Sequence, residues 1–170
     1  MDFYYHIPEY PENANPGGIF TRLFDGLGFR FYWATEGLGE KEYSFRPSED
    51  CMSIGEIISH IWGLVNWMNI SFNKQGFQSP DETSEIIYQT LEIIKNLRET
   101  TQNMENHEIT EIKIRDYPFW HILNGPLADA FTHVGQINSF RRLAGKPVSK
   151  ANVFTGLPPT SEKKDQLSED

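Results

Sequence analysis

Basic side chains are scarce in this sequence. Its 170 residues carry 15 Lys and Arg against 24 Asp and Glu, and the formal net charge is −9 at pH 7. A nucleic-acid groove needs clustered Lys and Arg to neutralise phosphates, and anionic membranes also attract basic patches. The charge balance therefore argues against nucleic acid and against a membrane surface as binding partners.

Cysteine and long apolar runs are scarce as well. The single cysteine, Cys51, has no partner in the chain for a disulfide, and we interpret it as an inert thiol. The opening MDFYYHIPEY lacks the basic start and apolar core of a secretory signal, and the sequence contains no run of about 18 apolar residues. We expect a soluble, cytoplasmic protein that does not span a membrane.

The length and the apolar content favour one domain. The hydrophobic share of 38% in 170 residues is enough for a single sizeable core. We expect the domain to span residues 1–155 and to begin with an irregular arm over residues 1–17, which are rich in Pro, Asn and Tyr. The polar residues 156–170 are expected to form a flexible tail.

Two helices are predicted in the first half of the chain. Apolar residues in steps of four from Ile19 to Phe31 indicate a helix over about residues 18–35. The sequence SIGE, which starts at Ser53, has the pattern of a capping box, and an apolar stripe at helical spacing continues to Met68. The second helix should therefore begin with Ser53 as its N-cap.

A third helix is predicted to begin at the motif SPDE, residues 79–82. This motif repeats the capping-box pattern and places Pro80 at the first helical position, where its missing N–H costs nothing. The apolar stripe then runs through Leu97. The polar stretch over residues 99–116 that follows is interpreted as a short extended segment or a long loop.

The fourth helix has two candidate starting points. It begins near Pro118 or at Pro126, and it ends where Gly145 and Pro147 supply a C-terminal signal. Together the four helical segments predict an all-α fold, an antiparallel four-helix bundle with an irregular N-terminal arm and a C-terminal tail.

The stretch GPLADAFTHVGQINSFRRLAG places Asp129 and His133 one helical turn apart. Side chains four residues apart on a helix differ by roughly 40° around its axis, so both can reach one small ion. A third ligand should come from another helix. His60, on the flank of the second helix's apolar stripe, is the best candidate, and His121 is the alternative if the helices pack differently.

Each of these residues also has a purely structural explanation. His60 could be a hydrogen-bonded histidine at the edge of the core. Asp129 would fall in the first turn of a helix that starts at Pro126, where the helix dipole stabilises an acid. His133 could donate to a loop carbonyl. Their coincidence, rather than any one of them, favours a metal site.

Two motifs resemble the DinB-like, or YfiT-like, metalloprotein superfamily, which is unrelated to the DNA polymerase that shares the first name. They are SIGEIISHIWGLVNW, which contains His60, and DAFTHVGQI, which contains His133. Members of that superfamily are four-helix bundles with a histidine in the second helix and an H-x-x-x-H pair in the last, often continuing as H-x-G-Q. The likeness spans roughly residues 19–155, including INSFRRLAGKPVS, and Asp129 replaces the first histidine of the pair.

The resemblance implies a three-ligand metal site formed by His60, Asp129 and His133. Two histidines and one carboxylate suit a divalent transition metal, zinc or nickel in the first place and iron or manganese as alternatives. Replacing a histidine by Asp129 lowers the net charge of the site by one, so a bound water should be less acidified than in a three-histidine site. Three protein ligands leave coordination positions open, which is typical of catalytic sites.

The function implied by the resemblance is that of a metal-dependent enzyme acting on a small-molecule substrate. A thiol-dependent S-transferase, with a low-molecular-weight thiol as second cofactor, and a hydrolase are the two reaction types considered. The alternatives are a non-catalytic metal- or ligand-binding protein and a structural bundle with a His/Asp hydrogen-bond network. An aromatic content of 14% and the resemblance also suggest a homodimer.

Further residues are weaker candidates for the pocket. Trp67 could form a wall of it, although an aromatic residue at this spacing is a core residue by default. Gln136 follows His133 by one turn and could hydrogen-bond a substrate or a neighbouring loop. Arg141 and Arg142 are explained by favourable charge near a helix C-terminus.

Overall fold

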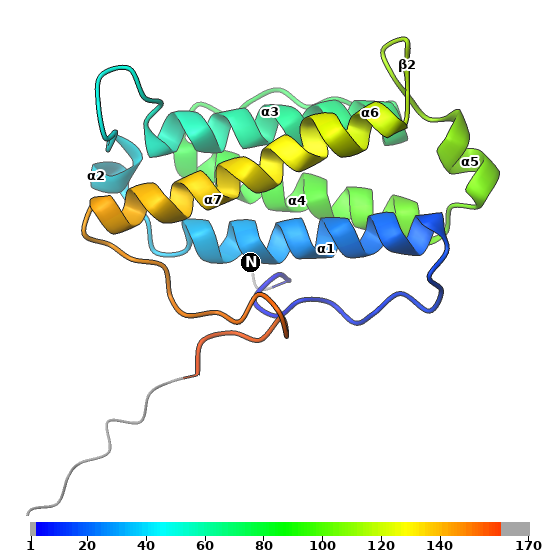
Figure 1. Cartoon of the computed structure of the whole chain (residues 1–170). Helices are drawn as coiled ribbons and strands as arrows, with labels where there is room; N and C mark the ends of the chain where they lie inside the picture. Colours follow the sequence, from blue (N-terminus) through cyan, green and yellow to red (C-terminus); the bar gives the residue numbers. More distant parts are fainter. Residues whose placement is uncertain (1–2, 161–170) are drawn as a thin grey trace, which may run out of the picture.

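The computed structural model describes residues 3–160 of the chain. Four long helices form a four-helix bundle, which confirms the predicted all-α fold (Figure 1). They are α1 (Pro16–Thr35), α3 (Ile54–Asn73), α4 (Thr83–Gln102) and α7 (Ala128–Leu143). The connections contain α2 (Glu40–Tyr43), α5 (Asn106–Glu111), the strands β1 (Lys113–Ile114) and β2 (Tyr117–Pro118), α6 (Trp120–Ile122) and the π-helical turn η1 (Leu123–Leu127). Within residues 3–160, no helix combines the length and the apolar character that crossing a bilayer requires.

Helices α3 and α4 run parallel, so the prediction of a fully antiparallel bundle is wrong. In the first half of each helix the Trp62 indole donates to Gln89 at 2.6 Å, and near the ends Thr100 donates to Asn73 at 2.7 Å. The connection over residues 74–82 returns along α3 (Figure 1). A chain of this length spans roughly 30 Å when extended, which matches a helix of 20 residues.

The two predicted capping boxes have different outcomes. The Ser53 hydroxyl accepts from the Glu56 N–H at 3.2 Å, and the Glu56 carboxylate accepts from the Ser53 N–H at 2.6 Å, so the box that starts α3 is confirmed. The box expected at residues 79–82 is wrong. Helix α4 begins at Thr83, its N-cap Glu82 makes no side-chain capping bond, and SPDE belongs to the extended connection.

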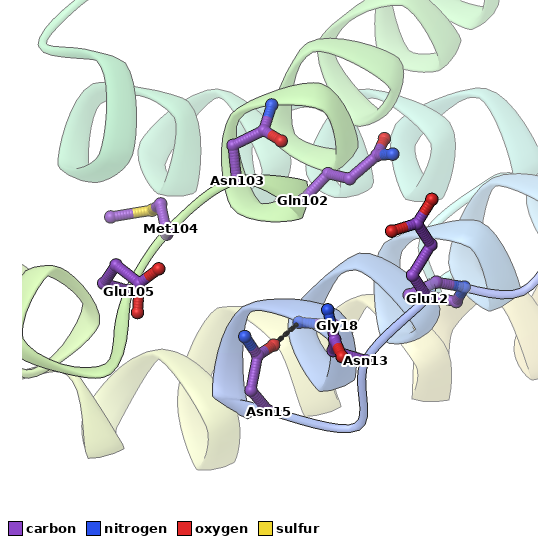
Figure 2. A pocket seen from close by; sticks show the side chains of 9 residues that line it. Glu12, Asn13, Asn15, Gly18, Gln102, Asn103, Met104 and Glu105 are labelled. Atoms are coloured by element: carbon purple, nitrogen blue, oxygen red, sulfur yellow. Dashed lines mark hydrogen bonds between the residues drawn. The ribbon is translucent and has the colours of Figure 1, made fainter.

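Helix α1 starts at Pro16, slightly earlier than predicted. The Asn15 side chain caps it by accepting from the Gly18 N–H at 2.8 Å (Figure 2). Amide and carboxylate side chains around this start and around the end of α4, such as Glu12 and Asn103, border a polar hollow of about 310 Å³ (Figure 2). The first residues of α1 thus lie against the α4–α5 connection.

The N-terminal arm packs onto α1. The buried ring of Tyr4 occupies the space that a Cβ at Gly28 would need, which explains why α1 tolerates a glycine in its interior. The Ile7 N–H donates to the Gly156 carbonyl at 2.9 Å, so the arm also contacts the C-terminal segment. Most of the predicted tail, from residue 161 on, lies outside the described residues.

The core lies between the apolar faces of the four long helices. Phe24, Ile57, Ile94 and Ile137, one from each helix, have no exposed surface. The polar segment over residues 99–116 is more ordered than predicted, because it completes α4 and then contains α5 and β1. Its apolar side chains Ile109 and Ile114 are buried and extend the core beneath the hairpin.

The end of α7 is tied to the end of α1. The Gly145 N–H donates to the Arg142 carbonyl and the Lys146 N–H to the Arg141 carbonyl, the pattern of a Schellman C-cap, with Gly145 at φ +79°. The Arg141 side chain is only 3% exposed and donates to the carbonyls of Ala34 at 2.7 Å and Glu36 at 3.1 Å. Arg141 therefore caps α1, a role that the dipole explanation missed.

Candidate metal centre

The helix that carries the candidate ligands starts through a kink. Helical backbone begins at Trp120 and continues through η1 into α7, with Gly125 at φ −97° and ψ −112°. Pro126 lacks an N–H for a regular helical bond, and a π-turn accommodates this interruption. Both predicted starting points thus have a counterpart: the helix begins near Pro118, and its regular part begins after Pro126.

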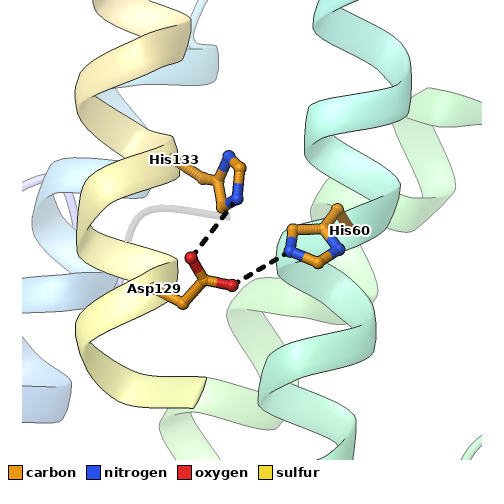
Figure 3. A group of neighbouring side chains, drawn as sticks. All are labelled: His60, Asp129 and His133. Carbon is orange, nitrogen blue, oxygen red and sulfur yellow. Dashed lines mark hydrogen bonds and ion pairs between the residues drawn. The ribbon is translucent and has the colours of Figure 1, made fainter. Parts of the chain in front are cut away.

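The structure brings His60, Asp129 and His133 together between α3 and α7 (Figure 3). His60 Nε2 lies 3.1 Å from Asp129 Oδ2, and His133 Nε2 lies 3.5 Å from Asp129 Oδ1. One potential ligand atom from each residue lies within 4.8 Å of the other two. Two donors bound at about 2.1 Å to one tetrahedral ion stand roughly 3.4 Å apart. The dimensions of the group therefore suit a single ion.

The group is open to solvent on one side. The side chains of His60 and Asp129 are 41% and 45% exposed, whereas that of His133 is 15% exposed. His133 thus forms the inner side of the group, and the other two side chains form its accessible side. An ion held here would keep coordination positions toward solvent.

Gln136 determines which nitrogen of His133 faces Asp129. The Gln136 side-chain oxygen lies 2.8 Å from His133 Nδ1. A carbonyl oxygen only accepts, so Nδ1 carries the hydrogen, and Nε2 of the neutral ring presents a lone pair toward Asp129. Gln136 therefore orients the histidine rather than bonding a loop or lining the pocket.

The helix-start explanation does not account for the position of Asp129. The N–H of Ala128 already donates to the carbonyls of Leu123 and Gly125, because α7 continues from η1 instead of beginning at a free end. The Asp129 carboxylate faces the two histidines of the group (Figure 3). Its orientation fits that of a ligand better than that of a helix cap.

A pocket of about 510 Å³ adjoins the group. Asp129 belongs to both, and Trp67 and His121 line the pocket on other sides. The His121 ring stands 4.8 Å from the Tyr117 ring and is not part of the three-residue group found within the described residues. The alternative in which His121 replaces His60 as a ligand is therefore not realised.

Several residues of the pocket were missed by sequence reasoning. The β1–β2 hairpin contributes Ile114 and Tyr117, and the kink contributes Asn124. The triplet Asn-Gly-Pro at residues 124–126 is a breaker signal that indicates an irregular helix at this point. Nothing comparable marks the hairpin, whose position depends on its packing against α3.

We expect Gln136→Leu to lower metal affinity about 10- to 100-fold, because the variant loses the hydrogen bond that fixes the His133 ring. Gln136→Glu retains an acceptor and should bind metal at least as well as the wild type. Competition with a chromogenic chelator measures the affinities. Gln78→Leu, at an exposed position of the α3–α4 connection, is the control. Equal affinities of Gln136→Leu and the wild type would contradict the orienting role.

Comparisons of the chain with protein-family models, with curated proteins and with solved structures found no match. The structure shows a helical bundle with a His-Asp-His group that could hold a metal ion. The resemblance to the DinB-like superfamily therefore rests on the sequence motifs around His60 and His133 and on this geometry.

Proposed function

We propose that the chain is a DinB-like metalloprotein in which His60, Asp129 and His133 hold one divalent transition-metal ion. The observation that carries the proposal is that two hydrogen-bond acceptors face each other, one on His133 and one on Asp129. When the ring of His133 is neutral and carries its hydrogen on Nδ1, toward the Gln136 oxygen, the Nε2 lone pair points at a carboxylate oxygen 3.5 Å away. A cation between these atoms removes their repulsion.

A hydrogen-bond network explains only one of the two contacts of Asp129. An N–H···O hydrogen bond is typically about 2.7 to 3.2 Å long. The His60–Asp129 distance of 3.1 Å fits this range, whereas the His133–Asp129 distance of 3.5 Å is longer. A direct bond would also require His133 to be protonated on both nitrogens. A metal ion needs neither condition, and the net charge of −9 favours cation binding in general.

The donor set restricts the metal. Two imidazole nitrogens and one carboxylate oxygen are of intermediate softness, so zinc and nickel suit the site best, with ferrous iron and manganese as alternatives. Hard cations such as Ca²⁺ and Mg²⁺ prefer all-oxygen sites. The chemistry of the donor atoms, rather than the fold, thus restricts which metal ion the site binds.

We propose further that the metal serves a reaction of a small molecule. The pocket beside Asp129 gives a substrate access, and the apolar side chains of Leu64 and Trp67 exclude water from one wall. His133 and Gln136 hold the inner side of the site. The resemblance suggests a thiol-dependent S-transferase or a hydrolase, in which the metal would lower the pKa of a low-molecular-weight thiol or of water. Cytoplasmic localisation and a homodimer belong to the same proposal.

A non-catalytic metal binder is the second candidate. The exposure of His60 and Asp129, at 41% and 45%, favours this function, because an accessible ion exchanges readily with other binders. The two functions differ in turnover. If the site is catalytic, the metal-loaded protein should form the thioether, and release the leaving group, from a low-molecular-weight thiol and an electrophile faster than the two reagents react alone.

Elemental analysis of the purified protein tests the metal site itself. We expect about one divalent ion per chain after reloading with zinc or nickel, and less than about a tenth of that in His133→Ala, because two remaining ligands bind weakly. His107→Ala, an exposed histidine on α5, is the matched control and should retain the ion. A His133→Ala protein with a full complement of metal would contradict the proposed site.

A further inference from the structure

One wall of the pocket follows α3 away from the metal group. His60, Leu64 and Trp67 lie on one face of the helix, at successive spacings of four and three residues. At 1.5 Å per residue, Trp67 stands roughly 10 Å along the axis from His60. Ile114 and Pro126 continue the apolar lining. A ligand along this wall would have one end at the metal group and the other at Trp67.

A cation stands at the Trp67 end of this wall. The Arg115 guanidinium carbon lies 5.1 Å from the centre of the Trp67 ring. Arg115 is exposed in the turn between β1 and β2, and it makes no ion pair within residues 3–160. The end of an apolar wall therefore carries an available positive charge in a chain of net charge −9.

The backbone at Arg115 is unfavourable for an arginine. Its φ is +55°, in the left-handed region that non-glycine residues rarely adopt. Glycine is the usual residue at such a position of a tight hairpin turn. The turn thus holds a strained residue where glycine would fit better, and the cationic side chain offers a reason for it.

Two polar groups of the pocket are free to bond a ligand. Within the described residues, the side chains of Asn124 and His121 make no hydrogen bond, and both line the pocket. The kink at Gly125 places Asn124 at this surface. The pocket therefore combines an apolar wall with uncommitted polar groups, and the Arg115 cation lies at its edge, over the Trp67 ring.

We propose that this pocket binds a small carboxylate with an apolar body. The carboxylate pairs with Arg115, the body lies along Leu64, Trp67 and Ile114, and the opposite end reaches the metal group. This inference rests on the proposed metal-dependent function and names its substrate class. A guanidinium matches a carboxylate with two parallel hydrogen bonds. The neighbouring Asp116 disfavours a doubly charged phosphate, because the turn offers one cation beside one anion.

Calorimetric titration with 4-phenylbutyrate and with its neutral amide, 4-phenylbutyramide, tests the proposal. The metal-free protein is used first, so that the carboxylate cannot bind to the ion instead. We expect the wild type to bind the carboxylate at least about tenfold more tightly than the amide. Arg115→Gly should abolish this preference while raising the thermal midpoint slightly, because glycine relieves the strain.

Lys74→Gly is the matched control for Arg115→Gly. Lys74 is the other non-glycine residue with positive φ in the described chain, at +56°, and it does not line the pocket. Its replacement also removes a cation from a left-handed position but should leave both affinities unchanged. The proposal is overturned by equal affinities of the wild type for the two probes, by a preference that survives Arg115→Gly, or by no binding of either probe at millimolar concentration.

Failure of this inference can be told apart from failure of the metal site. Full metal occupancy without binding of either probe would reject only the carboxylate pocket. Arg115-dependent binding of 4-phenylbutyrate by a protein that takes up no metal would support the pocket and reject the proposed metal-dependent function. In the zinc-loaded protein, binding of the probe should remain sensitive to Arg115→Gly.

Discussion

Asp129→Asn is expected to lose the metal ion, whereas Asp129→His keeps it. A neutral amide is a much poorer ligand than a carboxylate, so we expect metal affinity to fall by more than about 100-fold in Asp129→Asn, beyond the loss typical of an outer residue. Histidine at this position provides the three-histidine ligand set of the DinB-like superfamily, which the sequence motifs resemble. The measurement is the metal stoichiometry of the wild type and both variants after dialysis against a weak chelator. The wild type and Asp129→His should retain the ion, and Asp129→Asn should not.

The helix-dipole explanation of Asp129 predicts a different pattern. Both substitutions would then cost about 1 kcal/mol or less of stability, and neither would change metal content. Thermal midpoints recorded with and without added metal separate the cases, because an ion that binds only the folded state raises the midpoint. Asp116→Asn, on the exposed hairpin turn, serves as the control. Equal stoichiometry in all three proteins would exclude Asp129 as a ligand.

Arg98→Leu should destabilise the fold by about 3 to 5 kcal/mol at pH 8, because it leaves a buried carboxylate unpaired. Asp25 on α1 has no exposed surface, and its Oδ1 accepts from the Arg98 Nε of α4 at 2.7 Å. Among residues 3–160, Asp25 Oδ2 has no hydrogen-bond partner, and Arg22 approaches it only to 3.9 Å. Arg98 is therefore the main compensation for this charge.

The loss of stability caused by Arg98→Leu should be smaller at pH 5 than at pH 8. Burial raises the pKa of Asp25 from 3.8 to about 6, although Arg98 and Arg22 lower it. The folded protein then binds this proton more tightly than the unfolded chain, so the contribution of Asp25 to stability falls as the pH rises from about 4 to 6. Without Arg98 the pKa of Asp25 rises further. At pH 5 the Asp25 carboxyl of the variant is therefore protonated, and no unpaired charge is buried.

Urea unfolding of Arg98→Leu at both pH values measures this difference. Lys95→Leu is the control on the same helix, because Lys95 pairs with Glu99 at 3.9 Å near the surface, and such pairs contribute about 0 to 1 kcal/mol. The double variant Asp25→Asn/Arg98→Leu should lose most of the pH dependence. An Arg98→Leu penalty that is the same at pH 5 and pH 8 would contradict the role of Asp25.

Local sequence signals predicted most of the helices and the residues that form them. The capping box at Ser53 depends on contacts three residues apart, so it forms wherever the helix forms. The SPDE motif shows the limit of such signals. The same residue types can start a helix or lie in an extended connection. Here the chain must cross the length of α3 before α4 begins, so these residues belong to the connection.

The sequence by itself determined the fold class and the pairing of Asp129 with His133, because helical periodicity places residues four apart on one side. Only the tertiary structure decided that α4 runs parallel to α3, that Arg98 meets Asp25, and that Arg115 of the hairpin lies over the Trp67 ring. These contacts join residues far apart in the chain. They depend on how the helices dock and how the connections run, and no local spacing encodes either.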